Sequence, residues 1–104
     1  MATITKHFDA YKLWYNSGHP YEAHIYCYAG TAYMGRIVFF KDDAVIPANA
    51  NYGGNPSIHY PLSRFDHVIS ILRYEKPLYL FLNLDNLIGH LATAEREPTG
   101  EEES

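Results

Sequence analysis

The chain has 104 residues, of which 47% are hydrophobic and 19% charged, a composition typical of one folded globular domain and not of a disordered protein. Its formal charge of −4 arises in the last ten residues: five of the twelve acidic residues and one of the eight basic residues lie there, so residues 1–94 carry seven of each. A neutral body with an acidic tail argues against duplex nucleic acid and anionic membranes as partners.

The single cysteine, Cys27, excludes a disulfide within the chain, and the N-terminal segment has no apolar stretch typical of a signal peptide. No apolar run approaches the roughly 20 residues that a membrane-spanning helix needs. These features predict a cytoplasmic protein with no membrane partner. We expect one globular domain over residues 1–94 and a disordered acidic tail over residues 95–104.

Hydrophobic periodicity predicts six strands and one helix. Turn-forming residues without periodicity, over residues 42–56, predict a long loop that is either functional or mobile. Ser63 has the side chain of a helix N-cap, and the stripe that begins at Phe65 and continues to Leu72 follows helical spacing. Pro77 ends this helix. In chain order, the expected strands are residues 7–15, 21–28, 32–41, 57–60, 78–83 and 87–94, with the helix between the fourth and the fifth.

The order ββββαββ places the chain in the α+β class, as an antiparallel meander sheet with one packed helix. This order resembles that of Whirly-type single-stranded DNA-binding domains, where a curved antiparallel meander precedes a helix and subunits pair. The resemblance lies in the order of elements only, and a shared fold does not by itself carry a function.

Two of the predicted strands are apolar on both faces. In residues 78–82, three leucines point to one face while Tyr79 and Phe81 point to the other, and residues 33–41 show the same pattern. One helix covers one face of a sheet, so the second face must meet another subunit, a ligand or the long loop. We therefore predict a homodimer.

Aromatic residues supply the candidate binding surface. The chain has ten tyrosines, five phenylalanines and one tryptophan, and such side chains stack on bases or pack in protein interfaces. Alternation places Tyr26 and Tyr28 on one strand face, with Tyr33 and Phe39 across from them on the next strand. The predicted binding residues are Tyr26, Tyr28, Tyr33, Arg36, Phe39 and Tyr52.

No catalytic or cofactor motif is present in the sequence, so we predict no cofactor. His24, His59 and His90 each fall in a predicted strand, and their convergence on one sheet face would create a zinc site. Cys27 has apolar neighbours of the same strand parity, which indicates a buried thiol. The function predicted first is a small homo-oligomeric, non-enzymatic binding or protein-interaction domain. The alternative is single-stranded nucleic-acid binding through the aromatic face, with Arg36, Lys41, Arg64 and Arg73 as the cations, although the neutral charge of residues 1–94 disfavours it. A metal-dependent enzyme built on the histidines is a weaker alternative.

Overall fold

The computed structural model describes residues 2–17 and 22–93, which form two β-sheets and one α-helix. The α+β class, with antiparallel pairing and a single helix, is confirmed. The predicted tail, residues 95–104, lies outside the described residues. The elements are β1 (Thr3–Phe8), β2 (Ala10–Tyr15), β3 (Ala23–Ala29), β4 (Ala32–Phe40), β5 (Ala50–Tyr52), β6 (Asn55–Pro61), a 3-10 turn (Leu62–Arg64), α1 (Phe65–Tyr74), β7 (Leu78–Asn83) and β8 (Gly89–Thr93).

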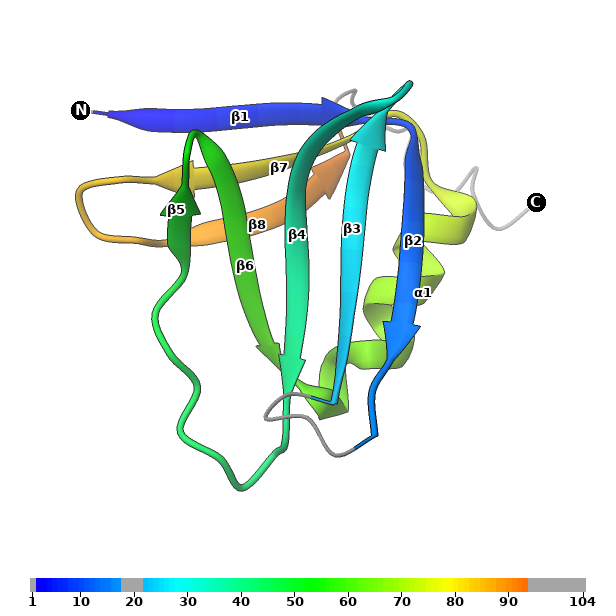
Figure 1. The fold of residues 1–104 in the computed structure, drawn as a ribbon, viewed down its shortest axis with the longest axis vertical. Coiled ribbons are helices and arrows are strands. Elements are labelled where there is room, and N and C mark those ends of the chain that lie inside the picture. Colours follow the sequence, from blue (N-terminus) through cyan, green and yellow to red (C-terminus); the bar gives the residue numbers. More distant parts are fainter. Residues whose placement is uncertain (1, 18–21, 94–104) are drawn as a thin grey trace, which may run out of the picture.

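The first predicted strand is in fact two strands that belong to different sheets. β1 pairs with β7 in the sheet β1-β7-β8, whereas β2 is the terminal strand of the sheet β2-β3-β4-β6-β5. The chain turns between them at Asp9, where the backbone N–H donates to the Tyr28 carbonyl at 2.9 Å and the carboxylate accepts the Gly30 N–H at 3.2 Å. Figure 1 shows the resulting crosswise arrangement, with β1, β7 and β8 running across the direction of the other five strands.

The predicted long loop is shorter than expected, because the chain forms a hairpin inside it. β5 pairs antiparallel with β6 through a turn whose two central residues, Gly53 and Gly54, have φ of 63° and 89°. Such positive φ values at both central positions are typical of a type I′ hairpin turn. β6 then pairs in parallel with β4, which makes the five-stranded sheet mixed. Only residues 41–49 remain as an irregular connection.

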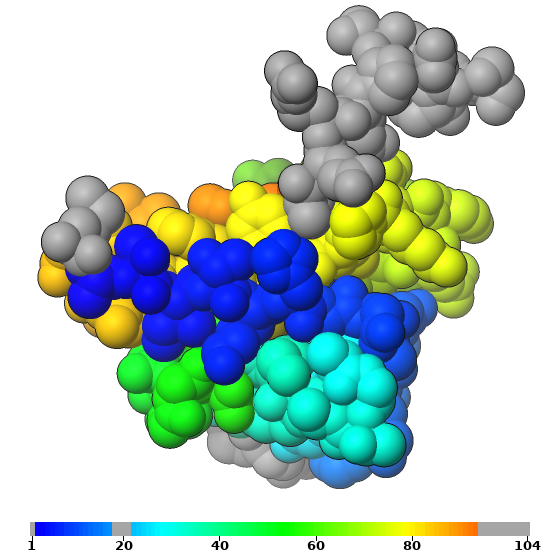
Figure 2. Space-filling model, turned by 90° about the horizontal axis from the view of Figure 1, so that it is seen from above, coloured from blue at the N-terminus to red at the C-terminus, as the bar shows by residue number. Residues whose placement is uncertain are grey.

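The core lies between the five-stranded sheet and a second layer made of the smaller sheet and α1. In Figure 2, β1 lies along the junction, with β7 and β8 on one side and β3 to β6 on the other. Leu78, Leu80 and Leu82 point inward and are at most 5% exposed. They belong to the same buried cluster as the inner-face side chains of β3, β4 and β6. The buried core cluster is Phe8, Ala23, Ile25, Cys27, Ile37, Phe39, Ile58, Val68, Leu72, Leu78, Leu80 and Leu82.

The helix begins differently from the prediction. Ser63 is not an N-cap, because it lies within the 3-10 turn that precedes α1. Neither the 3-10 turn nor α1 has a side-chain hydrogen bond that caps its N-terminus. Instead, the Asp42 carboxylate accepts the backbone N–H of Ser63 at 2.9 Å. The apolar stripe is placed as expected, with Val68 and Leu72 buried and Phe65 partly buried against the core. Within residues 2–17 and 22–93, no helix is long and apolar enough to cross a membrane.

Candidate binding face of the five-stranded sheet

The register of the five-stranded sheet decides which aromatic side chains share its outer face, the face turned away from α1 (Figure 1). Tyr26 pairs with Arg36, and a register shift after Cys27 then brings Tyr28 opposite Tyr33. The shift also corrects one expected position. Phe39 pairs with Ala23 on the inner face and is fully buried, so it lies on the opposite side of the sheet from the tyrosines.

We call the outer side of this sheet the tyrosine face. Its aromatic rings form a connected series, from Trp14 to Tyr26 (centroids 5.1 Å apart), from Tyr26 to Tyr33 (5.6 Å) and from Tyr33 to Tyr28 (6.0 Å). Most of the contacts are edge-to-face, the arrangement that aromatic pairs prefer. The outward-facing strand residues with large or polar side chains are Lys12, Trp14, His24, Tyr26, Tyr28, Tyr33, Arg36, Phe40, Tyr52, Asn55, Ser57 and His59.

A cavity of about 390 Å³ opens on the tyrosine face, and we call it the tyrosine hollow. Five of the six predicted binding residues line it. Tyr33 is 39% exposed and Tyr52 is 57% exposed, so aromatic surface is available at its rim. Partial burial raises the pKa of Tyr33, so its phenol stays neutral near pH 7. The lining residues are Tyr26, Tyr28, Tyr33, Arg36 and Tyr52.

Arg36 is held in the hollow by contacts on two sides. Its Nε donates to the Ser57 hydroxyl at 2.9 Å, and its guanidinium lies 5.1 Å from the centre of the Tyr52 ring. The Ser57 hydroxyl lies 2.8 Å from Nε2 of His59, and Nδ1 of His59 lies 3.0 Å from the Pro47 carbonyl. Because a carbonyl can only accept, Nδ1 is the protonated nitrogen, and Ser57 donates to Nε2. Within residues 2–17 and 22–93, the other N–H groups of Arg36 have no hydrogen-bond partner, so they can meet a ligand.

His59 is neutral in this chain of hydrogen bonds. Burial lowers its pKa, with a smaller lowering from the Arg36 charge, while hydrogen bonds to backbone carbonyls act in the opposite direction. A protonated Nε2 would turn the acceptor of the Ser57 hydroxyl into a second donor. The position of Arg36 is therefore coupled to the protonation state of His59.

The charge of the tyrosine face differs from that of the whole chain. Its outward-facing strand residues include the cations Lys12 and Arg36 and no aspartate or glutamate. Lys12 lies opposite Tyr26, which itself pairs with Arg36, so the two cations flank the same tyrosine. The sequence analysis did not include Lys12 among the binding residues. The face on which Lys12 lies could be read from the alternation along its strand, but its position beside Tyr26 depends on the pairing of β2 with β3.

The three histidines proposed for a metal site do not converge. His24 and His59 lie on the tyrosine face, whereas His90 lies in the smaller sheet, stacked on Phe81 with centroids 4.7 Å apart. Among the described residues, no group of three or more His, Cys, Asp or Glu is placed to hold a metal ion. Cys27 is fully buried, and burial raises the pKa of its thiol to about 12, so it carries no thiolate for nucleophilic chemistry.

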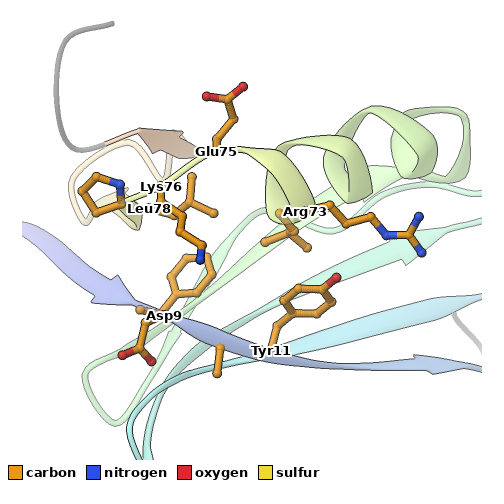
Figure 3. A pocket seen from close by; sticks show the side chains of 10 residues that line it. Asp9, Tyr11, Arg73, Glu75, Lys76 and Leu78 are labelled. Atoms are coloured by element: carbon orange, nitrogen blue, oxygen red, sulfur yellow. The ribbon is translucent and has the colours of Figure 1, made fainter. Parts of the chain in front are cut away.

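A second cavity, of about 490 Å³, lies at the end of α1 beside the β1–β2 corner (Figure 3). Its floor is formed by core side chains, and Tyr11 and Lys76 extend into it, whereas the Glu75 carboxylate points away. Arg73 and Lys76 are offset by Asp9 and Glu75, so this lining has no net charge. The tyrosine hollow is the more selective surface, because it combines aromatic rings with charge of one sign.

Comparison with known proteins found no family model, no curated protein and no solved structure that matches the chain. The Whirly-like order of elements therefore stays a resemblance in element order alone.

Proposed function

We propose that the protein is a non-enzymatic binding protein that binds single-stranded nucleic acid on the tyrosine face. A cytoplasmic location is part of this proposal, since the one cysteine is an unpaired, buried thiol. The observation that carries the proposal is the tyrosine hollow, in which four tyrosines surround Arg36 on a face whose strand residues include no carboxylate.

The chemistry of the hollow matches the two repeating parts of a single strand. Unstacked bases bind aromatic rings, at about 1–3 kcal/mol per base, and arginine or lysine neutralises the phosphates. Tyr33 and Tyr52 offer exposed surface, and Arg36, in contact with the Tyr52 ring, has N–H groups other than Nε that bond to none of the described residues. Duplex nucleic acid fits poorly, because its bases are stacked inside the helix.

The same surface could bind a protein, which is the function that the sequence suggested first. Tyrosine and arginine are enriched in protein interfaces as well, but the outward-facing strand residues of this face carry two cations and no carboxylate. The charge pattern thus favours a polyanion, and a protein ligand becomes an outcome of the test.

The test is fluorescence anisotropy with a labelled single-stranded oligonucleotide of about 12 nucleotides, titrated with the full chain at low and at moderate salt. With two cations on the face, we expect modest affinity and a slope of log K against log [salt] of about −1.4, from roughly −0.7 for each phosphate neutralised. A duplex of the same sequence should bind much more weakly.

Matched variants locate the binding surface. Tyr52→Ala should weaken binding roughly 5- to 150-fold, as expected for one lost stacking contact. Tyr74→Ala removes a tyrosine that is 76% exposed on α1, away from the tyrosine face, and should change nothing. Lys12→Ala should reduce the salt slope by about 0.7. Absence of binding at about 100 μM protein in low salt, or equal losses for the two tyrosine variants, would refute the proposal.

A further inference from the structure

β2 is a terminal strand with large apolar side chains in contact with solvent. Leu13, Trp14 and Tyr15 are 40%, 49% and 65% exposed. Among the strands that the structure describes, β2 pairs with β3 alone, so alternate N–H and C=O groups along its other side have no partner strand there. Unpaired backbone groups beside exposed apolar side chains form a template for pairing with another strand.

The protections that usually prevent such pairing are weak in β2. Natural edge strands are kept short, are charged, contain proline or carry a bulge. β5, at the opposite edge, has only three residues. β2 has six residues with a regular register to β3, no proline, and Lys12 as its one charged side chain.

We infer that β2 pairs antiparallel with β2 of a second copy of this chain and joins two five-stranded sheets into one continuous sheet. A two-fold axis perpendicular to the sheet keeps inner residues beside inner residues and outer beside outer, as the burial of one face requires. With the axis at Leu13, Lys12 lies opposite the partner's Trp14, and Tyr11 lies opposite the partner's Tyr15.

The sequence of β2 is complementary to itself in this register. Each Lys12 ammonium meets an indole ring, which is the preferred partner in a cation–π contact. Leu13 meets its own copy on the inner face. A register centred on Lys12 would instead place two ammonium groups directly opposite each other, which is unfavourable. The charge pattern thus favours a second copy as the occupant, and it favours the register centred on Leu13 over the one centred on Lys12.

Pairing through β2 places the two tyrosine faces on the same side of one sheet. Trp14 from both copies then lies near the middle of the joined surface, next to the ring series that leads to each tyrosine hollow. The pairing itself uses backbone groups and β2 side chains, so it does not depend on nucleic-acid binding.

Sedimentation velocity of the full chain, without nucleic acid and from about 1 to 100 μM, tests the pairing. The wild type should reach twice the chain mass of 11.9 kDa. Trp14→Lys places a lysine opposite each Lys12 and should yield monomer, whereas Trp14→Glu places a carboxylate there and should retain the dimer. Tyr74→Lys, which adds the same charge on α1, should leave the dimer intact. Circular dichroism checks that each variant is folded.

A cross-link provides a second measurement should Trp14→Lys fail to fold. Leu13→Cys lies on the two-fold axis and should form a disulfide-linked dimer with oxidised glutathione, whereas Tyr74→Cys should not. The buried Cys27 thiol does not interfere. A monomeric wild type at about 100 μM, a dimeric Trp14→Lys variant or a Leu13→Cys variant without cross-link would each overturn the inference. Oligonucleotide binding by a monomeric wild type would refute the pairing alone, and a dimer that binds no oligonucleotide would refute the proposed function alone.

Discussion

Asn49 joins three parts of the fold, and its removal should cost more stability than its place in a loop suggests. Its Oδ1 accepts the backbone N–H of His59 at 2.7 Å, and its Nδ2 donates to the Leu87 carbonyl at 3.0 Å. β5 pairs with β6 only as far as Ser57, so beyond that point the amide of Asn49 takes the place of a neighbouring strand. Asn49→Ala therefore leaves one donor and one acceptor of the backbone without their partners.

The expected cost follows from these two bonds. An unsatisfied, partly buried N–H costs about 1–3 kcal/mol, and an ordinary hydrogen bond contributes about 0.5–1.5 kcal/mol, so with partial access of water we expect a loss of about 2 kcal/mol. Urea unfolding followed by Trp14 fluorescence, at one fixed protein concentration, measures it.

Asn51→Ala is the matched control, because it removes one exposed bond, from the Gly54 N–H to the Asn51 side chain. Its cost should be about 0.5 kcal/mol. A loss for Asn49→Ala no larger than that of Asn51→Ala would show that Asn49 is not a structural link, and the reasoning would be wrong.

Three further predictions concern β4, the His59 hydrogen bonds and the helix. Gly35→Ala should destabilise by about 2 kcal/mol or more, because the new Cβ would lie 2.7 Å from the Pro56 carbonyl oxygen, and an unchanged melting temperature would contradict this. The pKa of His59 is lowered in the fold, so its contribution to stability is complete above the ordinary pKa of 6.5 and is lost as the pH falls below that value. The urea midpoint should therefore be lower at about pH 5 than at about pH 7.5, and this difference should be smaller in His59→Gln. Leu72→Ala should cost roughly 2–5 kcal/mol, while Ser63→Ala should cost under about 0.5 kcal/mol since its side chain caps nothing, and a reversed ranking in urea unfolding would contradict the helix assignment.

The parts of the fold that follow from local pattern could be predicted. The helical stripe and the alternating leucines of residues 78–82 each need one buried face, and the structure buries both. The turn at Asp9 could not be predicted, because residues 7–15 alternate without interruption, and only pairing with two different sheets divides them. The hairpin at Gly53-Gly54 had a readable signal, two adjacent glycines between short extended segments.

The candidate site could be predicted where side chains alternate regularly between the two faces along a strand. Tyr26 and Tyr28 keep their parity along β3. The register shift between the pairs Cys27–Gly35 and Tyr28–Tyr33 places Tyr33 and Phe39 on opposite faces of the sheet. Nothing local in the sequence fixes such a shift. The convergence of Tyr52 on Arg36 depends on the parallel pairing of β4 with β6 and on the β5 hairpin, both of which are long-range events.

The pairing of β1 with β7 also has a consequence for the order in which the chain can fold. The two strands are far apart in the sequence: Phe8 pairs with Leu78, 70 positions further on. Closing such a distance costs chain entropy before any contact compensates for it, and proteins rich in distant pairings fold in roughly milliseconds to seconds. During synthesis, β1 has no edge to join until β7 has left the ribosome. The β2–β3–β4 meander, whose pairings are local, can form first, with its inner leucine and isoleucine side chains uncovered until the smaller sheet closes over them.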